Sequence, residues 1–173
     1  MSGPAASGKS RWAEHLAATD GRPVVYLATG PDLPHDQGWQ RRLQRHRQRR
    51  PPHWRTLEVG AELPQALEAL SWDELALVDS LGTWVAADLD AEAPQWERSC
   101  TRLLAALERC PAGVVLVCEE AGWGVVPATA AGLRFRERLG DLHGQLARRC
   151  TRSWLVLQNR ALDLLPLSLP VPE

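Results

Sequence analysis

Short apolar runs alternate with amphipathic segments along most of the chain. Five short segments, most of them rich in Val and Leu, predict strands, and apolar positions at helical spacing fill the stretches between them. The predicted strands span 23–29, 54–59, 75–81, 113–120 and 153–158. The predicted helices span 10–18, 36–50, 62–70, 95–109 and 128–149, and the last is expected to be broken near Gly140. The Pro- and Leu-rich tail from 163 is expected to be irregular.

The alternation of strand and helix predicts an α/β fold. Continuous apolar strands are buried on both faces, so we expect a mostly parallel sheet with helices on both sides. Ligands of such sheets bind at the carboxyl ends of the strands. No internal repeat or linker interrupts the pattern, and residues 1–173 are therefore predicted to form a single domain.

A glycine-rich segment, GPAASGKS, opens the chain and fits the phosphate-binding pattern G-x-x-x-x-G-K-[ST]. Its glycines let the backbone wrap round a phosphate, at the positive end of the following helix. The lysine would reach the β- and γ-phosphates, and the serine would bind Mg²⁺. The predicted nucleotide-binding residues are Gly3, Pro4, Ala5, Ala6, Ser7, Gly8, Lys9 and Ser10. The fold expected is thus a P-loop nucleotide-binding domain; the alternative is a glycine-rich N-terminal tail.

A phosphate loop normally follows a buried strand, but only Met1 and Ser2 stand before Gly3. We therefore expect the first strand of the sheet to be missing from this chain, which would leave the loop without its anchor. Because the later motifs are intact, we expect the natural protein to begin several residues upstream, with Met1 at an internal position. The other hypothesis is an N-terminally truncated, inactive relative.

The composition is that of an ordinary globular protein, with 45% hydrophobic residues, 24% charged residues and a net charge of −1. It gives no argument for nucleic acid or an anionic membrane as a partner, and no run approaches the about 18 apolar residues of a membrane span. The four cysteines lack C-x-x-C spacing and are expected to be buried free thiols in a reducing cytoplasm. Among 20 Lys and Arg residues, Lys9 alone is lysine, and a phosphate loop requires this compact ammonium.

Carboxylates end two of the predicted strands. Asp79, in LALVDS, suits the metal-binding acid expected near a phosphate loop, so the predicted Mg²⁺ ligands are Ser10 and Asp79. Asp79 could instead cap a helix or lie in a turn. Glu119 and Glu120 could position metal or substrate, or could equally be surface caps.

The segment QRRLQRHRQRR at 40–50 contains six arginines and His46. Trp39, Leu43 and His46 are spaced i, i+4, i+7 and share one helix face, which the apolar pair should turn towards the protein body. A neutral imidazole there could attack phosphorus and form a phosphoramidate, while the arginines neutralise phosphate charge. A solvated basic face and a nucleic-acid patch remain alternative interpretations.

Two further motifs are more specific than the phosphate loop: HRQRRPPHWRTLE at 46–58 and EAGWGVVP at 120–127. With GPAASGKS, VVYLATG, LVDSLGTWV and RFRERLGDLHGQLA they are spread over about 150 of the 173 residues. On these residues the chain resembles the bifunctional adenosylcobinamide kinase / adenosylcobinamide-phosphate guanylyltransferase family of cobalamin assembly.

The resemblance implies an enzyme with two activities. ATP or GTP would phosphorylate the aminopropanol hydroxyl of adenosylcobinamide; GTP would then guanylylate a histidine, and that GMP would pass to the cobinamide phosphate, giving adenosylcobinamide-GDP. By its place in the motif, that histidine would be His46. The further implied GTP contacts are Thr29, Gly30, Pro31, Arg47, Gln48, Arg49, Arg50, Glu58 and Asp79. The family's studied members are trimers. A different P-loop kinase, using the basic helix only as a phosphate clamp, is the other hypothesis.

Overall fold

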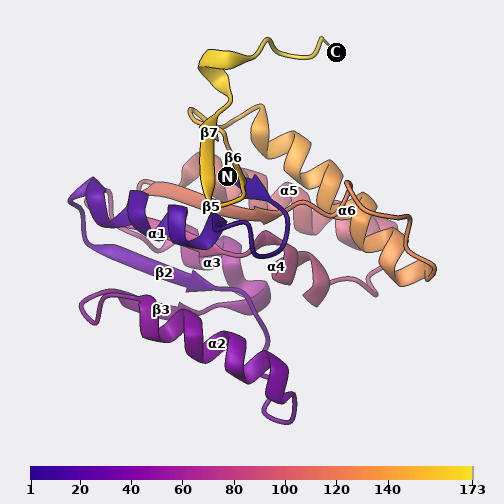
Figure 1. The fold of residues 1–173 in the computed structure, drawn as a ribbon, viewed down its shortest axis with the longest axis horizontal. Helices are drawn as coiled ribbons and strands as arrows, with labels where there is room; N and C mark the ends of the chain where they lie inside the picture. The colour runs from indigo at the N-terminus through magenta and orange to yellow at the C-terminus, as the bar shows by residue number, and fades with distance from the viewer. Residues whose placement is uncertain (173) are drawn as a thin grey trace.

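A seven-stranded sheet with helices on both faces organises the computed structural model, which describes residues 1–172 (Figure 1). The strand order is β3-β2-β4-β5-β1-β6-β7, and every neighbouring pair is parallel except β6 and β7. The strands are β1 (Ser2–Gly3), β2 (Val24–Ala28), β3 (Arg55–Glu58), β4 (Leu75–Asp79), β5 (Gly113–Glu119), β6 (Trp154–Leu157) and β7 (Arg160–Asp163). The predicted α/β class and mostly parallel sheet are confirmed.

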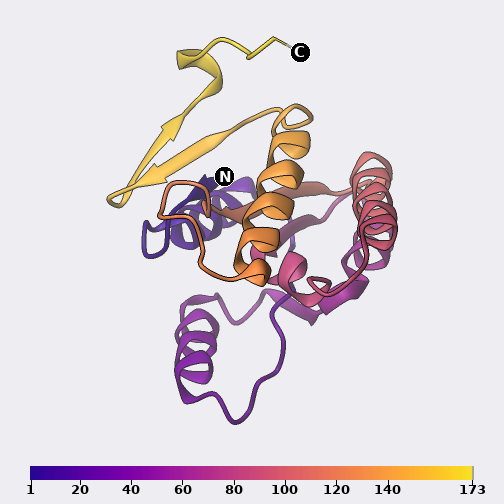
Figure 2. The ribbon, with the colours of Figure 1, turned by 90° about the vertical axis from the view of Figure 1, so that its right-hand side faces the viewer.

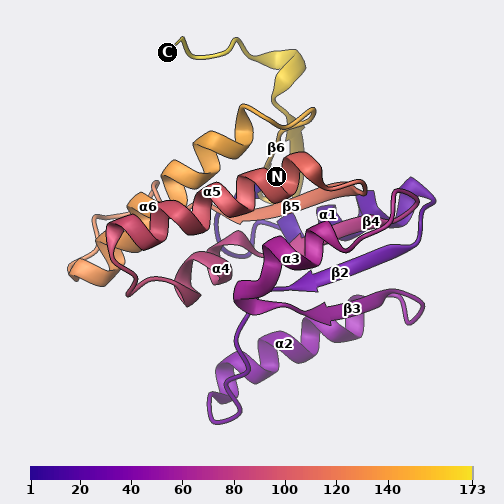
Figure 3. The same ribbon diagram turned by 180° about the vertical axis from the view of Figure 1, so that it is seen from behind.

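Helices cover the two faces unequally. One face carries α3, α4, α5 and α6 (Figure 3). Their leucines and tryptophans pack on Val25, Leu27 and Val78 in the larger core. The other face carries α1, whose Ala13 and Ala17 pack on a smaller cluster of strand residues. The helices are α1 (Lys9–Asp20), α2 (Gln37–Arg49), α3 (Leu63–Glu68), α4 (Leu81–Ala87), α5 (Ala93–Arg109) and α6 (Ala130–Ala147), with 3₁₀ turns at Gly60–Glu62 and Leu165–Leu167.

Helix α2 lies at one end of the molecule, beside the edge strand β3, and loops connect it on both sides (Figure 2). Asp36 caps its start by accepting a hydrogen bond from the Trp39 N–H at 2.9 Å, and Pro51-Pro52 follows its last turn. Its half-buried positions include Trp39, Leu43 and His46. The predicted face of this helix therefore does turn towards the body of the protein.

The first strand is present, which corrects the expectation that it is missing. Ser2 pairs with Cys118 of β5 and with Leu155 of β6, so β1 lies inside the sheet. Two residues are too few to make a hydrophobic pattern, but their backbone groups bond to strands on both sides. A Cβ on Gly3 would lie 2.3 Å from the Val156 carbonyl oxygen, so only glycine fits there. The phosphate loop is thus anchored, and the inactive-relative hypothesis loses the structural reason behind it.

Two smaller predictions are also wrong, and one strand was not predicted. Helix α6 is unbroken at Gly140, which faces solvent while Leu139, Leu142 and Leu146 hold the helix to the core. The strand β7, which pairs antiparallel with β6, was not predicted, whereas the tail after Asp163 is irregular as expected, apart from one 3₁₀ turn. The segment after Asp79 forms α4 rather than prolonging the strand.

The described cysteines are free thiols, as predicted: Cys100 and Cys118 are buried, and Cys110 and Cys150 are partly buried. Among the residues that the structure describes, we find no helix with the length and apolar character needed to cross a bilayer.

Candidate active site

The phosphate loop joins β1 to the start of α1. Gly8 has a φ of +99°, in the left-handed region where glycine is favoured, and the buried Lys9 donates from Nζ to the Pro4 carbonyl oxygen at 3.3 Å. The Ser7 hydroxyl is buried and has no hydrogen-bond partner among the described residues.

Helix α2 is held against three neighbouring elements. The Trp39 indole N–H donates to the Pro31 carbonyl at 2.8 Å, and the indole ring fills the space that a side chain on Gly30 would need. Arg47 pairs with Glu58 of β3 at 2.7 Å, and Arg49 pairs with Glu14 of α1 at 2.8 Å. These contacts place α2 above the carboxyl ends of β2, β3 and β4.

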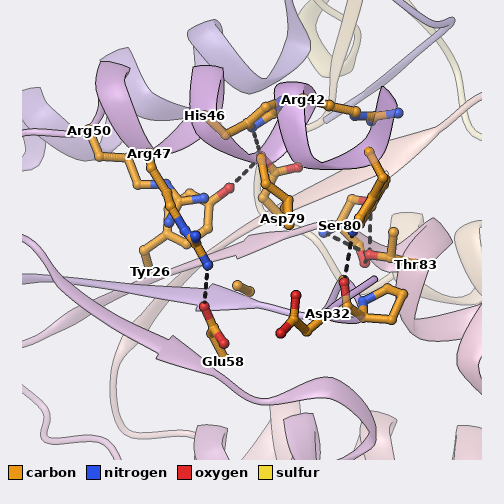
Figure 4. A pocket seen from close by; sticks show the side chains of 15 residues that line it. Tyr26, Asp32, Arg42, His46, Arg47, Arg50, Glu58, Asp79, Ser80 and Thr83 are labelled. Carbon is orange, nitrogen blue, oxygen red and sulfur yellow. Dashed lines mark hydrogen bonds and ion pairs between the residues drawn. The ribbon is translucent and has the colours of Figure 1, made fainter. Parts of the chain in front are cut away.

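Asp79, at the carboxyl end of β4, is the centre of the site. Its Oδ2 lies 2.7 Å from the Tyr26 hydroxyl and 3.3 Å from His46 Nδ1, and its Oδ1 lies 3.5 Å from the Ser10 hydroxyl (Figure 4). Burial alone would raise the pKa of this carboxyl group, but the hydrogen bonds from His46 and Tyr26 outweigh it, and the pKa of Asp79 lies below its ordinary value. Asp79 is therefore an anion that links the phosphate loop to His46.

Tyr26 is the least expected member of this group. It is buried in β2, and burial together with the adjacent Asp79 charge raises the pKa of its hydroxyl far above the ordinary value. The hydroxyl therefore stays protonated and donates to Asp79. The Arg50 guanidinium stacks over the ring, 3.3 Å from its centre, and ties Tyr26 to the end of α2.

Two cavities meet at His46. The larger, about 680 Å³, is lined by the phosphate loop from Ala5 onward, by arginines of α2 and by Phe135 of α6. Its volume is in the range of ligand pockets. The smaller, about 50 Å³, is a narrow cleft between α2 and the sheet, lined by Gly30, Pro31, Arg47, Arg50, Glu58 and Asp79 among others. His46, Arg42 and Thr83 line both cavities, so the histidine stands in the wall between them.

Most of the predicted nucleotide contacts are brought together here. Ala5 to Ser10 and Arg49 line the larger cavity. The predicted contacts that line the smaller one are Gly30, Pro31, Arg47, Arg50, Glu58 and Asp79. Gly3, Pro4, Thr29 and Gln48 line neither cavity. Thr29 is fully buried and bonds to Ser80 and Thr83, which gives it a structural part, and Gln48 is exposed on α2.

The two glutamates at the end of β5, Glu119 and Glu120, contact other protein groups. Glu119 lines the larger cavity, but its carboxylate accepts from the Ser80 hydroxyl at 2.5 Å and from the Gly82 N–H at 2.9 Å, at the start of α4. Glu120 lies 3.3 Å from His143 Nδ1. Of the alternatives that the sequence left open, these contacts favour the cap for Glu119. Within residues 1–172, no three His, Cys, Asp or Glu side chains are grouped as a metal site.

Sequence reasoning missed Tyr26 and the Ser80–Thr83 turn. A signal for Tyr26 exists, since a hydroxyl in an otherwise aliphatic buried strand must find a partner. Thr83 lies three positions after Ser80 at the start of a helix, which is the spacing of an N-terminal capping pair.

Comparison with known proteins identifies the family of this chain. A family model described as cobinamide kinase / cobinamide phosphate guanyltransferase matches residues 1–164. The bifunctional adenosylcobalamin biosynthesis protein CobU of Escherichia coli is 36% identical over 172 aligned residues, covering 91% of this chain and 93% of that protein. The protein CobP of Pseudomonas aeruginosa, described in the same words, is 41% identical over 154 residues, with 87% of each chain covered.

A third relative, CobU of Salmonella typhimurium, is 36% identical over 172 residues and 93% of its length is covered. The family model spans both the phosphate loop and the helix that carries His46, and the relatives are matched over nearly their whole length. The chain therefore belongs to the cobinamide kinase / cobinamide phosphate guanyltransferase family.

Proposed function

We propose that the chain phosphorylates adenosylcobinamide and then transfers GMP from GTP to the phosphorylated product, giving adenosylcobinamide-GDP, with His46 as the nucleophile. The observation that carries this proposal is the place of His46. It lies on a basic helix, in the wall shared by the phosphate-loop cavity and the cleft under α2, beside the Asp79 carboxylate.

The larger cavity suits a triphosphate. Lys9 and the N–H groups at the start of α1 offer donors on one side. Arg42, Arg45 and Arg49 offer positive charge on the opposite wall. Phosphates between these walls would place the α-phosphorus within reach of His46. The Glu58 carboxylate in the adjoining cleft could accept hydrogen bonds from guanine or ribose.

The guanylyl step then needs no proton transfer at phosphorus. The free imidazole nitrogen of His46 attacks the α-phosphorus of GTP, and pyrophosphate leaves with the electron pair of the broken P–O bond. An oxygen of the cobinamide phosphate next attacks the same phosphorus, and the electron pair of the P–N bond returns to the imidazole. The arginines of α2 stabilise the charge that builds on the phosphate oxygens.

Magnesium fits the mouth of the phosphate loop. Ser10 Oγ and Asp79 Oδ1 lie 3.5 Å apart there, and Mg²⁺ prefers oxygen donors, commonly one or two carboxylates completed by substrate phosphates. We propose that these two residues hold it. When bound, the ion supplies charge neutralisation on the phosphates of the nucleotide.

The corrinoid would approach over the loop between β5 and α6. Trp123 is 60% exposed and Val125 is 94% exposed, and this loop leaves the sheet directly after Glu119 in the wall of the larger cavity. An apolar surface beside the phosphates suits a large macrocycle whose side chain must reach them. We propose this loop as part of the corrinoid-binding surface.

Assembly and location follow from the family resemblance. We propose a cytoplasmic homotrimer, and the exposed Leu167, Leu169 and Val171 after β7 are apolar side chains that a neighbouring subunit could cover. Light scattering of the purified protein tests this assembly. A monomer at micromolar concentration would contradict it.

The central test compares two single variants. His46→Ala should abolish transfer of label from α-labelled GTP to cobinamide phosphate but leave measurable phosphorylation of cobinamide, because the phosphate loop is intact. Lys9→Ala should impair both half-reactions. If His46→Ala still transfers GMP, His46 is not the nucleophile; if the wild type shows neither activity, the proposed function itself is wrong.

A further inference from the structure

A third cavity lies beside the phosphate loop, on the flank away from His46. The sheet places β1 between β5 and β6, and the tip of the β6–β7 hairpin lies next to the phosphate loop (Figure 2). Between this hairpin and the start of α1 is a cavity of about 300 Å³, called the hairpin cavity below. Its lining residues are Gly8, Arg11, Trp12, Val156, Asn159 and Ala161.

We propose that the hairpin cavity binds the purine nucleoside of the triphosphate that phosphorylates cobinamide. In guanylyl transfer, by contrast, the guanine lies in the cleft under α2. The inference rests on the proposed function. It goes beyond that function because it assigns a second base site and gives the triphosphate opposite directions in the two half-reactions.

The two half-reactions break the triphosphate at opposite ends. In phosphorylation, the hydroxyl oxygen of the acceptor forms a bond to the γ-phosphorus, and the bond from that phosphorus to the β–γ bridging oxygen breaks. The nucleoside diphosphate leaves with the electron pair, and the hydroxyl proton passes to water. In guanylyl transfer the imidazole bonds to the α-phosphorus, and pyrophosphate is the leaving group.

The acceptors of both reactions face the same cavity. His46 lines the larger cavity, and the proposed corrinoid surface borders it after Glu119. With the α-phosphorus in that cavity, the nucleoside continues into the cleft under α2, because His46 lines both spaces. With the γ-phosphorus there instead, the nucleoside must leave across the phosphate loop. The hairpin cavity lies in that direction, since Gly8 and Arg11 line both it and the larger cavity.

The lining of the hairpin cavity suits a purine. The half-buried indole of Trp12, with Val156 and Ala161, supplies apolar surface for a flat ring, and the volume is at the lower end of ligand pockets. Trp154 packs edge-on against this indole, with ring centres 5.1 Å apart, and so holds it in place. The Asn159 amide carries both a donor and an acceptor, the combination that pairs with the edge of adenine.

The hairpin tip is fixed to the phosphate loop. Gln158 and Asn159 have φ values of +49° and +60°, so the chain turns sharply there, and the Asn159 N–H donates to the Ser7 carbonyl oxygen at 3.0 Å. The Asn159 side chain accepts a hydrogen bond from Arg11, and a Cβ on Gly8 would lie 3.0 Å from its Oδ1. A base bound at the tip would therefore lie at a fixed distance from phosphates in the loop.

Two neighbouring substitutions on β7 test the proposal. Ala161 faces inward and lines the hairpin cavity, whereas the next residue, Leu162, is on the opposite face and is 46% exposed. Ala161→Phe should fill the cavity and raise KM for ATP in cobinamide phosphorylation about 10-fold or more. KM for GTP in transfer to cobinamide phosphate should stay within about 2-fold of wild type, which also shows that the variant is folded. Leu162→Phe, the matched control, should change neither value.

The outcomes separate the inference from the function on which it rests. An unchanged KM for ATP in Ala161→Phe, or an equal rise for ATP and GTP, would overturn the second base site while leaving the proposed function intact. A wild-type protein that phosphorylates no cobinamide would overturn both.

A measurement on the wild-type protein avoids any effect of substitution on folding. The protein is irradiated with 8-azido-ATP, with and without excess ATP, and the labelled peptides are identified by mass spectrometry. We expect ATP-sensitive labelling of the peptides that contain Trp12 or residues 156–161. Labelling confined to residues 30–58, around the cleft under α2, or no ATP-sensitive labelling, would overturn the inference.

Discussion

Removing the Glu119 carboxylate tests whether the turn after Asp79 is built as the structure indicates. Glu119 bonds to the Ser80 hydroxyl at 2.5 Å and to the Gly82 N–H at 2.9 Å, and so fixes the start of α4 immediately after Asp79. Hydrogen bonds to charged groups contribute about 1.5–3 kcal/mol each, and a helix cap about 0.5–2 kcal/mol. Because water in the larger cavity can replace part of this, we expect Glu119→Ala to lower the free energy of unfolding by about 2 kcal/mol.

For a chain of this length, that loss corresponds to a fall in Tm of about 4–8 °C. Urea titration and thermal unfolding followed by circular dichroism measure it. Glu119→Gln is the matched variant, since its amide oxygen can still accept from Gly82, and it should lose about half as much. If Glu119→Ala changes stability by less than about 0.5 kcal/mol but abolishes activity, Glu119 binds substrate or metal and the capping argument is wrong.

Three further predictions rest on other features. Lys9→Arg should be as inactive as Lys9→Ala, because the planar guanidinium cannot replace a buried ammonium in the loop. A steady-state rate for Lys9→Arg equal to that of the wild type would contradict this. Trp123→Ala should raise KM for the corrinoid about 5-fold or more with KM for GTP unchanged, and equal effects on both would argue against a corrinoid surface. Burial raises the pKa of Cys118 to about 12 and that of Cys100 to about 11. These thiols should therefore resist iodoacetamide at pH 8 and react only when the protein is denatured. Rapid labelling of either cysteine in the native protein, measured by peptide mass spectrometry, would contradict their burial.

Much of the architecture could be predicted from sequence because it depends on local patterns. The apolar runs at 23–29, 75–81 and 113–120 predicted strands within a few residues of those observed, and the i, i+4, i+7 spacing on α2 placed His46 on the inward face. The edge strand β7 and the two-residue β1 escaped prediction for a different reason. They exist because partner strands supply their hydrogen bonds, and no local pattern records a partner.

The sequence named candidate residues for the site but not how they are arranged. It predicted Lys9, His46 and Asp79 as candidates for the chemistry, but it could not indicate that Asp79 contacts His46 or that Tyr26 shares the same oxygen. Those contacts join three elements distant in sequence and depend on how α2 packs over the sheet. Thr29 and Gln48 were predicted as nucleotide contacts because they lie in the matching motifs, but neither residue lines a cavity.

The most direct test of the account is the mass of the protein after incubation with GTP in the absence of corrinoid. We predict one covalent GMP per chain, stable in base and labile in acid, mapped to the peptide that contains His46 and absent from His46→Ala. Subsequent addition of cobinamide phosphate should release it as the GDP-linked product. An adduct on another residue, or product formed at full rate without any adduct, would contradict the central claim that His46 carries GMP between the two substrates.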